Sequence, residues 1–504
     1  MNTVVKMLEA AYADFPDKKA LADEYRSVTY AQYRNDARRI ADRIIRDISK
    51  GQIKRPVAVL ISRTVDPVIA FMGIVYSGNF YVPIDYTLPE ERRNLILQEL
   101  DPLGIIDARH KEDVIEGTYR FEDLLDGDPE SAETDFYMEH TIDTDPLYSI
   151  FTSGSTGVPK GVLIAHRGVM DLVDVFDRAF GFDADCIFGN QAPFDFDVSV
   201  KDIYNSLYHG ACVEVLPHKL FVMPKKLVAY LAERKVDTLI WAVSAVRIIS
   251  DFKAFDTEEG QGIRGFRYVM FSGEVMPPKT INYWMERYPD AMYVNLYGPT
   301  EITCNCTYKV IDHMYPNDGI LPAGKAFENT RIYLLDNEGN IITKQNEVGE
   351  ICVEGTGLAL GYYNNPEKTA EAFRRLPSEK GYADMLYHTG DLGYWNADMD
   401  IVFANRADSQ IKHMGHRIEL GEIEIALNAM PFITVACCIY DTKRERIVCV
   451  YQAAEEMRRQ IVGELGKKLP KYMWPNKYIR YDQIPMNSHG KIDRASLRKM
   501  IIKD

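Results

Sequence analysis

The 504-residue sequence has no apolar run long enough to cross a membrane. Residues 1–21, MNTVVKMLEAAYADFPDKKAL, mix charges into the apolar positions and lack the continuous apolar core of a signal peptide. Low-complexity tracts and short internal repeats are missing as well. These absences exclude a fibrous or membrane-spanning protein, and we expect a globular cytoplasmic protein without membrane insertion.

An excess of basic residues is also lacking. The chain has 59 Lys and Arg against 74 Asp and Glu, a net charge of -15, which argues against a nucleic-acid-binding protein, because phosphate contacts need a basic face. The residues from Ser409 to Asp504 depart from this average, with 17 basic against 11 acidic residues, leaving 42 against 63 for residues 1–408. A small basic C-terminal part on an acidic body suggests two surfaces with different partners.

Paired C-x-x-C spacings, which mark many zinc sites, do not occur. Most of the eight cysteines lie in apolar, strand-like stretches, and we expect reduced core residues. They are Cys186, Cys212, Cys304, Cys306, Cys352, Cys437, Cys438 and Cys449.

Alternating strand and helix patterns dominate the first three hundred residues. Residues 55–86 read as a βαβ unit, and apolar runs then recur at CIFGNQAP, GACVEVLP, DTLIWAV, RYVMFSG and MYVNLYG, each followed by a helix-like or turn segment. This alternation predicts a mostly parallel sheet covered on both faces, with its ligand crevice at the carboxyl ends of the strands.

From about Gly319 the pattern changes to short alternating strands with turn signals, which predict antiparallel structure. A polar gap at Asp408 and Ser409 predicts a domain boundary. We therefore expect an α/β fold: a large N-terminal domain of mixed, mostly parallel sheets with helices and a small β-barrel-like part (residues 1–407), then a small mobile α+β domain (residues 408–504).

Residues 150–168, IFTSGSTGVPKGVLIAHRG, form a glycine- and hydroxyl-rich loop with one lysine, Lys160, between apolar flanks. The order of residues is not that of a Walker A loop. Glycines still allow backbone N–H groups to form an anion nest, hydroxyls add donors, and lysine adds a compact positive charge. The loop alone predicts either a phosphate-binding loop or an ordinary flexible turn.

Four further motifs accompany this loop: NLYGPTE (295–301), YHTGDLG (387–393), NRADSQIKHMGHRIELGEIE (405–424) and NSHGKIDR (487–494). In order and spacing the series resembles the adenylate-forming superfamily. With YVPID (81–85) and APFDFDVSVKDIY (192–204), the chain resembles its amino-acid adenylation branch, which holds stand-alone nonribosomal-peptide adenylation enzymes and D-alanine:carrier-protein ligases.

The resemblance implies an ATP site, with each residue assigned by its place in a motif. It assigns Thr152, Ser153, Thr156 and Lys160 to the β- and γ-phosphates, Asn295 and Tyr297 to adenine, Thr300 to the α-phosphate, Glu301 to Mg²⁺, Asp391 to the ribose hydroxyls, Arg406 to ribose or phosphate, and Phe403 to the nucleoside. A carboxylate suits Mg²⁺, which prefers hard oxygen ligands. The expected cofactors are ATP and Mg²⁺.

The resemblance also implies two successive reactions. Lys491, with Thr300 and Glu301, would act in forming an adenylate from a free amino acid, and rotation of the C-terminal domain about Asp408 would then remove Lys491. Gly415 would leave room for the phosphopantetheine arm of a separate carrier protein, whose thiol forms a thioester. No cysteine nucleophile is needed.

Asp197 is the residue that favours an amino-acid substrate, because the resemblance implies that it binds the α-amino group. The alternative from the residues alone is an aspartate facing solvent at a helix start. The other implied pocket positions are Val198, Lys201, Trp241, Met270, Ser272, Leu296, Cys304 and Asn305. Trp241, Met270 and Leu296 fill volume and favour a small side chain.

Lys201 leaves the substrate open, because it either pairs with an acidic substrate or points into water. A D-alanine-type or other small amino acid is the favoured substrate, although Ser272 stands where D-alanine ligases typically carry cysteine, a departure that leaves D-alanine itself unassigned. Small residues (alanine of either hand, serine, glycine) rank first and aspartate or glutamate second. An acyl-CoA synthetase and a non-catalytic nucleotide-binding protein are the competing functions; the carrier, the pathway and the oligomeric state stay open.

Overall fold

The computed structural model describes residues 2–111, 113–154, 157–376, 384–406, 410–485 and 492–502, without the side chains of Asn405 and Ala495. The chain divides into two compact units. The first comprises Met1–Tyr86, Leu100–Ile150 and Gly161–Asn405, and the second comprises Thr87–Glu99, Phe151–Lys160 and Arg406–Asp504. The expected boundary at residues 407/408 stays a prediction, since residues 407–409 lie outside the described ones.

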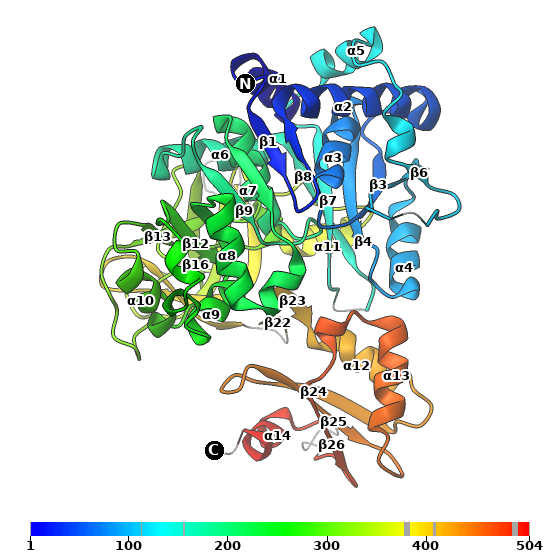
Figure 1. Ribbon diagram of the computed structural model, residues 1–504. Coiled ribbons are helices and arrows are strands. Elements are labelled where there is room, and N and C mark those ends of the chain that lie inside the picture. The colour runs from blue at the N-terminus through cyan, green and yellow to red at the C-terminus, as the bar shows by residue number, and fades with distance from the viewer. Residues whose placement is uncertain are drawn as a thin grey trace. The chain divides into compact units, whose positions relative to one another are not determined.

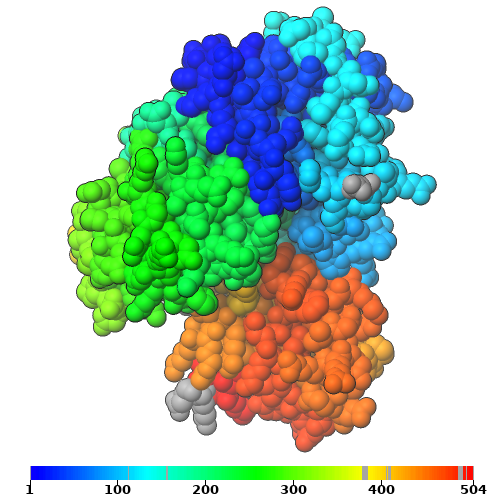
Figure 2. All heavy atoms as spheres, viewed as in Figure 1, coloured from blue at the N-terminus to red at the C-terminus, as the bar shows by residue number. Residues whose placement is uncertain are grey.

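A nine-stranded sheet dominates the first unit (Figure 1). Its strands in spatial order are β15 (Lys325–Ala326), β14 (Thr307–Ile311), β13 (Met292–Tyr297), β12 (Tyr268–Ser272), β11 (Thr238–Ala242), β9 (Ile187–Asn190), β10 (Cys212–Val215), β1 (Lys19–Ala22) and β2 (Ser27–Thr29). The six strands from β13 to β1 run parallel, as the apolar runs predicted. Pairing of β1 with β10 brings the dark blue N-terminal segment beside the green one (Figure 2).

The two faces of this sheet bury different apolar clusters. Ile240 and Met270 belong to one cluster, whereas Trp241 and Phe271 belong to the other. Adjacent residues of a strand point to opposite faces, so neighbouring strands in register share this alternation. The covering helices include α6 (His166–Phe180) and α7 (Val198–His209), and α8 (Pro224–Arg234), α9 (Val243–Asp251) and α10 (Pro278–Arg287).

A seven-stranded sheet contains the predicted βαβ unit, with α3 (Asp66–Tyr76) between two parallel strands. In spatial order the strands are β18 (Gly361–Tyr362), β8 (Lys160–Ala165), β7 (Pro146–Thr152), β4 (Phe80–Asp85), β3 (Pro56–Ile61), β5 (Ile105–Asp107) and β6 (Tyr119–Arg120). The other helices of the unit are α1 (Val4–Asp14), α2 (Tyr30–Arg43), a π-helix (Ile44–Ser49), α5 (Ala132–His140) and α11 (Pro366–Ala372).

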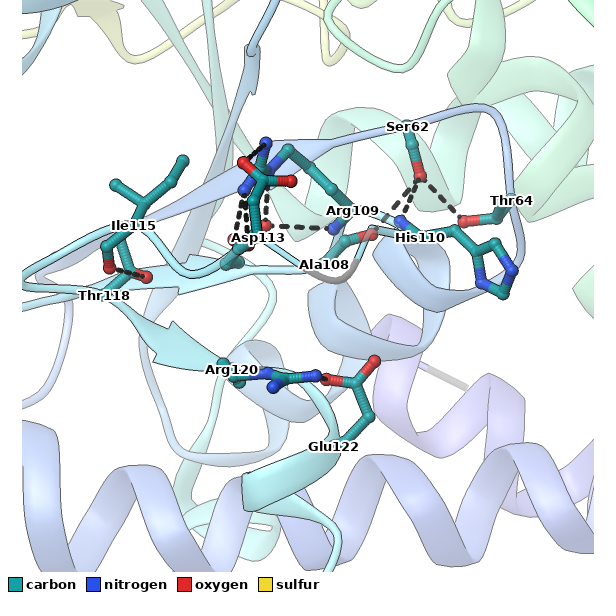
Figure 3. Close-up of polar contacts among 11 residues, drawn as sticks. Ser62, Thr64, Ala108, Arg109, His110, Asp113, Ile115, Thr118, Arg120 and Glu122 are labelled. Atoms are coloured by element: carbon teal, nitrogen blue, oxygen red, sulfur yellow. Dashed lines mark hydrogen bonds and ion pairs between the residues drawn. The ribbon is translucent and has the colours of Figure 1, made fainter.

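Polar contacts close the carboxyl ends of β3 and β5 (Figure 3). The Ser62 hydroxyl donates to the Ala108 carbonyl at 3.4 Å. Arg109 is buried and forms a two-point ion pair with Asp107, with Nε–Oδ1 and Nη2–Oδ2 distances of 2.8 Å, and its Nη1 lies 3.3 Å from Asp113 Oδ2. The chain's own groups therefore satisfy this strand edge.

The predicted antiparallel region forms a five-stranded sheet. Its strands are β16 (Thr330–Leu335), β17 (Gly349–Gly355), β20 (Met385–Trp395) and β19 (Phe373–Arg375), with β21 (Ile401–Arg406) beside β20. The pairs β16–β17, β17–β20 and β19–β20 are antiparallel. This antiparallel sheet occupies the region where we expected the small β-barrel-like part.

The second unit is α+β. It contains α4 (Glu90–Leu100), the hairpin of β22 (Gln410–His413) and β23 (His416–Glu419), α12 (Leu420–Asn428), α13 (Arg458–Lys468), α14 (Arg494–Ile501), and a sheet of β24 (Val435–Asp441), β25 (Arg446–Gln452) and β26 (Lys477–Tyr481). A buried ion pair joins Arg92 of α4 to Glu422 of α12.

All eight cysteines are free and buried, as expected. Within the described residues, none of the helices has the length and apolar character needed to span a membrane.

Candidate active site

Tyr297 and Asp391 meet although they lie 94 residues apart in the sequence. Tyr297 ends β13, and its hydroxyl donates to Asp391 Oδ2 of β20 at 2.6 Å. Burial, and then the Asp391 carboxylate, raise the pKa of Tyr297 well above its ordinary value, so the phenol keeps its proton and acts as the donor. The structure thus brings together the residues expected at adenine and at ribose.

Glu350 and His388 support the turn that carries Asp391, and sequence reasoning missed Glu350. One carboxylate oxygen of Glu350 lies 2.9 Å from His388 Nδ1, and the other accepts the Gly390 N–H at 3.0 Å. Burial raises the pKa of Glu350, but the His388 ring and the Gly390 N–H together hold it below its ordinary value. Glu350 was visible in the sequence as the glutamate of the Gly-Glu pair in QNEVGEICVEG, but nothing in this segment indicated which residue it contacts.

Cys352 completes a cluster with these two residues, and their possible ligand atoms lie within 4.8 Å of one another. Burial raises the pKa of the Cys352 thiol well above its ordinary value, so the sulfur stays protonated at neutral pH. The cluster is therefore a hydrogen-bonded support for the 388–391 turn.

Glu301 is fully buried and accepts a hydrogen bond from the Tyr362 hydroxyl at 2.8 Å. It lies in a short 3₁₀ turn, Thr300–Ile302, directly after β13. Tyr362, from β18, is a second residue that sequence reasoning missed. A carboxylate has several lone pairs on its two oxygens, so it can accept this hydrogen bond and also bind a hard divalent cation.

The remaining nucleoside residues lie in the same unit. Asn295 donates from its amide Nδ2 to the Pro322 carbonyl at 2.8 Å, so the chain already uses one of its amide hydrogens. Thr300 begins the 3₁₀ turn and is buried. Phe403, which lies on β21, packs against the apolar cluster that contains Ile240 and Met270.

The glycine-rich loop belongs to the second unit. The Ser153 hydroxyl donates to the Arg417 carbonyl of β23 at 2.9 Å, and Thr152 Oγ1 lies 3.5 Å from the Lys160 carbonyl. Gly157 has a φ of 84°, a left-handed conformation that favours glycine, and its N–H donates to the Gly154 carbonyl at 3.0 Å. Thr156 lies outside the described residues, so its assignment stays a prediction.

Gly415 forms the tip of the β22–β23 hairpin. Met414 and Gly415 have φ values of 53° and 82°, as a two-residue turn with two left-handed residues requires. Arg406 is the last residue of β21. Lys491 and Asp408 lie outside the described residues, so their roles stay predictions.

Four of the expected substrate residues gather around the start of α7 and the end of β12. Asp197 precedes α7, and Lys201, one turn later, donates from Nζ to the Ser272 hydroxyl at 3.0 Å. Burial raises the pKa of Cys304 well above its ordinary value, Asp197 raises it further, and Lys201 lowers it. These mutual effects place Asp197, Lys201 and Cys304 close together.

Lys201 does not point into water: it is fully buried, with 0% of its surface exposed. Its neighbour Asp202 is equally buried and accepts from Asn190 Nδ2 at 2.9 Å. Burial raises the pKa of Asp202 to about 7, although the Asn190 hydrogen bond, Lys201 and Arg63 all oppose the rise. Near neutral pH this carboxyl is therefore only partly charged.

The apolar positions separate into two sets. Met270, Leu296 and Cys304 belong to one buried cluster, which Val198 joins from its edge. The structure does not bring Trp241 to this group, because its side chain lies on the opposite face of the sheet and its indole N–H donates to the Gly189 carbonyl at 2.7 Å. Only two of the three volume-filling residues therefore remain to favour a small substrate side chain.

Asn305 directly follows Cys304 in the sequence. It lines a cavity with Gly168, Thr303 and Val353. Among the described residues neither its amide nitrogen nor its amide oxygen has a hydrogen-bond partner.

The chain is similar to several known proteins. D-alanine--D-alanyl carrier protein ligase of Lacticaseibacillus rhamnosus is 30% identical and aligns with 99% of each chain. Tyrocidine synthase 1 of Brevibacillus parabrevis is 29% identical over 98% of this chain, which spans 45% of that relative's length. The adenylation domain AlmE of Vibrio cholerae, solved with glycyl-adenosine-5'-phosphate, is 20% identical to this chain. The two structures superimpose with a TM-score of 0.83 over 100% of this chain and 98% of AlmE, which establishes the fold.

Other curated relatives are longer still. This chain spans 19% of a mycosubtilin synthase and 14% of a surfactin synthase, both from Bacillus subtilis. The sequence profile described as AMP-binding enzyme matches residues 8–363, more than half of the chain. The family expected from the motifs is thus confirmed: the chain belongs to the AMP-binding enzymes.

Proposed function

We propose that this chain activates a free amino acid with ATP and then passes it to the phosphopantetheine thiol of a separate carrier protein. The observation that carries this proposal is Asp197, which lies with Lys201 and Cys304 at the carboxyl end of the parallel sheet of an AMP-binding enzyme. A carboxylate there suits an α-ammonium group, whereas the acyl substrate of a CoA synthetase offers no cation.

In the first step, a carboxylate oxygen of the amino acid attacks the α-phosphorus of ATP, the bond to the β-phosphate oxygen breaks, and pyrophosphate leaves. Thr152, Ser153, Thr156 and Lys160 would hold the departing phosphates, Thr300 the α-phosphate, Arg406 the ribose or phosphate, and Asn295, Tyr297 and Phe403 the nucleoside. Asp391 would accept the ribose hydroxyls. Hydrogen bonds and charges fixed beforehand favour the charge that develops on the transferring group.

Glu301 fits a Mg²⁺ ion, because its carboxylate is buried, is oriented by the Tyr362 hydroxyl and has oxygens of the kind that magnesium prefers. When bound, the ion would neutralise phosphate charge.

In the second step, the carrier thiol attacks the aminoacyl carbonyl, a thioester forms, AMP leaves, and the thiol proton passes to solvent or buffer. Residues 408–504 would rotate about Asp408 between the two steps, with Lys491 acting in the first and Gly415 beside the arm in the second. The basic excess after Ser409 would attract an acidic carrier. We expect this ATP-consuming reaction in the cytoplasm.

Two relatives' names support the carrier step. One is a D-alanyl carrier protein ligase, and one solved neighbour is an NRPS protein containing adenylation and PCP domains, with a TM-score of 0.83 and 24% identity.

Amino-acid-dependent ATP–pyrophosphate exchange tests the first step, with all L- and D-amino acids as substrates. We expect exchange with a narrow set, near-complete loss of exchange in Lys491→Ala with ATP binding retained, and no change in the control Lys499→Ala, an exposed lysine of α14. Exchange that depends on fatty or aryl acids instead, or unimpaired exchange in Lys491→Ala, would contradict the proposal. Loading of an isolated holo-carrier, followed by mass spectrometry, then tests the second step.

A further inference from the structure

Lys201 is a buried cation inside the group of side chains that we assign to the substrate. It is the fourth residue of α7, one helical turn after Asp197, which corresponds to about 5.4 Å along the helix axis. Its Nζ donates to the Ser272 hydroxyl at 3.0 Å, and none of its surface is exposed.

The charge of Lys201 has no matching anion. Among the residues that the structure describes, it forms no ion pair with a carboxylate, and its side-chain hydrogen-bond partners are the neutral Ser272 hydroxyl and Cys304 thiol. Buried lysines usually extend their ammonium group to water, and an ammonium buried without a partner is strongly unfavourable. The arrangement therefore favours an anion from outside the chain.

The neighbouring acids do not supply that anion. Asp202, the next residue, accepts from Asn190, and burial keeps its pKa at about 7, so it carries only part of a charge at neutral pH. Asp197 is assigned to the α-amino group in the proposed function. The other walls are Met270, Leu296 and the protonated thiol of Cys304, which are neutral.

We infer that the amino acid bears an acidic side chain, whose carboxylate binds the Lys201 ammonium and the Ser272 hydroxyl. This inference rests on the proposed function and names its substrate class. The two anchors then match the two poles of one ligand: Asp197 takes the α-ammonium and Lys201, one turn further along α7, takes the side-chain carboxylate. Ser272 accepts from Lys201 and still has its own hydrogen to donate.

An acidic substrate also explains why serine fits at position 272. A site built around hydrogen-bonding groups rejects an analogue that lacks the matching group far more strongly than an apolar pocket rejects a missing methylene, because the buried polar atoms are left without partners. Alanine would leave a methyl group facing the ammonium, and an amide side chain would accept its hydrogen bond without balancing its charge.

The test is pyrophosphate exchange with matched pairs of amino acids: aspartate against asparagine, glutamate against glutamine, each in both hands, with alanine, serine and glycine alongside. For the wild-type chain we expect kcat/KM for one acidic amino acid to exceed that for its amide by about 100-fold or more, the discrimination typical of a buried charge pair. Lys201→Met removes the charge, keeps an unbranched side chain only one atom shorter, and should lower the acidic-to-amide ratio by about the same factor. The matched control is Lys226→Met on the exposed face of α8, which should leave the ratio unchanged.

A second readout does not depend on turnover. The acidic amino acid with a non-hydrolysable ATP analogue should raise the thermal unfolding midpoint of the wild-type chain, and its amide should raise it less. If Lys201→Met fails to fold, the wild-type panel and this shift still decide the question.

The outcomes separate the two proposals. Exchange with a neutral amino acid but not with an acidic one would overturn the inference and leave the amino-acid ligase standing. A Lys201→Met ratio equal to that of the wild type would also overturn it, since the substrate side chain would then not bind the ammonium. Absence of exchange with every amino acid would count against the proposed function itself.

Discussion

Arg109 and Lys201 are both buried cations of the first unit, but their charges are balanced in different ways. Arg109 meets the Asp107 carboxylate at two points. It meets Asp113 at a third point (Figure 3). Among the described residues, Lys201 has neutral hydrogen-bond partners, the Ser272 hydroxyl and the Cys304 thiol. Carboxylates of the chain balance the charge of Arg109, whereas we infer that the substrate balances the charge of Lys201. The partner set of a buried charge therefore helps to distinguish a stabilising ion pair from a binding site.

Breaking the Arg109 pair should have the largest effect on stability. Arg109→Met leaves Asp107 buried with an uncompensated charge, and we expect the free energy of unfolding to fall by about 3–5 kcal/mol. Lys201→Met removes a cation without stranding a paired anion, so we expect no comparable loss. Urea denaturation followed by tryptophan fluorescence and circular dichroism measures both.

The control for this comparison is Arg120→Met, because Arg120 forms an exposed ion pair with Glu122 in the same region (Figure 3). An exposed pair contributes about 1 kcal/mol or less. Equal destabilisation by Arg109→Met and Lys201→Met would mean that the two cations are held alike.

A pH titration of stability sharpens the comparison, because it asks whether Asp202 balances Lys201. Burial raises the pKa of Asp202 to about 7, so the folded state binds a proton that the unfolded state releases near pH 4. The free energy of unfolding should therefore fall as pH rises from about 4 to about 7 and then level off. Asp202→Asn removes this contribution. Between pH 4 and pH values above 7, the free energy of unfolding of the wild type should therefore fall further than that of the variant, by at least about 1.4 kcal/mol, the value of one pKa unit.

Only the difference between wild type and Asp202→Asn is diagnostic. Burial also raises the pKa of Asp195 to about 7, which makes the free energy of unfolding of both proteins depend on pH. If wild type and Asp202→Asn show the same pH dependence, then Asp202 is ionised throughout and serves as the counter-charge of Lys201. That result would remove the contrast between the two cations.

Sequence patterns predicted the parallel strands well, because apolar runs and turn residues are local signals. The side to which Trp241 points was not accessible in this way. β11 is buried at all five positions, so the alternation that reveals the two faces of a half-exposed strand is hidden. The burial of Lys201 was hidden for the same reason, since α7 is buried from Ser199 to Leu207.

Contacts between distant segments were the other limit. Glu350 and Tyr362 lie in motifs without an evident role, and only the fold places them on Gly390 and Glu301. Likewise, no local pattern groups residues 87–99 and 151–160 with the C-terminal part. The motifs could identify the ligand-binding residues, because their chemistry is local, but not the residues that position them.

Glu301 is an intermediate case between the two cations, and its test has the smallest expected effect. Tyr362 donates to this buried carboxylate at 2.8 Å, and the proposed Mg²⁺ would supply balancing positive charge. Tyr362→Phe removes one hydrogen bond, worth about 1 kcal/mol, so we expect the half-saturating Mg²⁺ concentration in pyrophosphate exchange to rise about five-fold. The matched control is Tyr363→Phe, the next residue, whose aromatic ring is equally retained.

A purely structural role for Tyr362 would lower the unfolding midpoint and leave the Mg²⁺ dependence unchanged. A shift in both variants would assign the effect to the local chain and not to the Glu301 bond. If Tyr362→Phe alone shifts the Mg²⁺ dependence, the three charges form a series. The chain balances the charge of Arg109, the chain and a cation together balance that of Glu301, and the substrate balances that of Lys201. The counter-charge that the chain does not supply then predicts the charge of the ligand at each site.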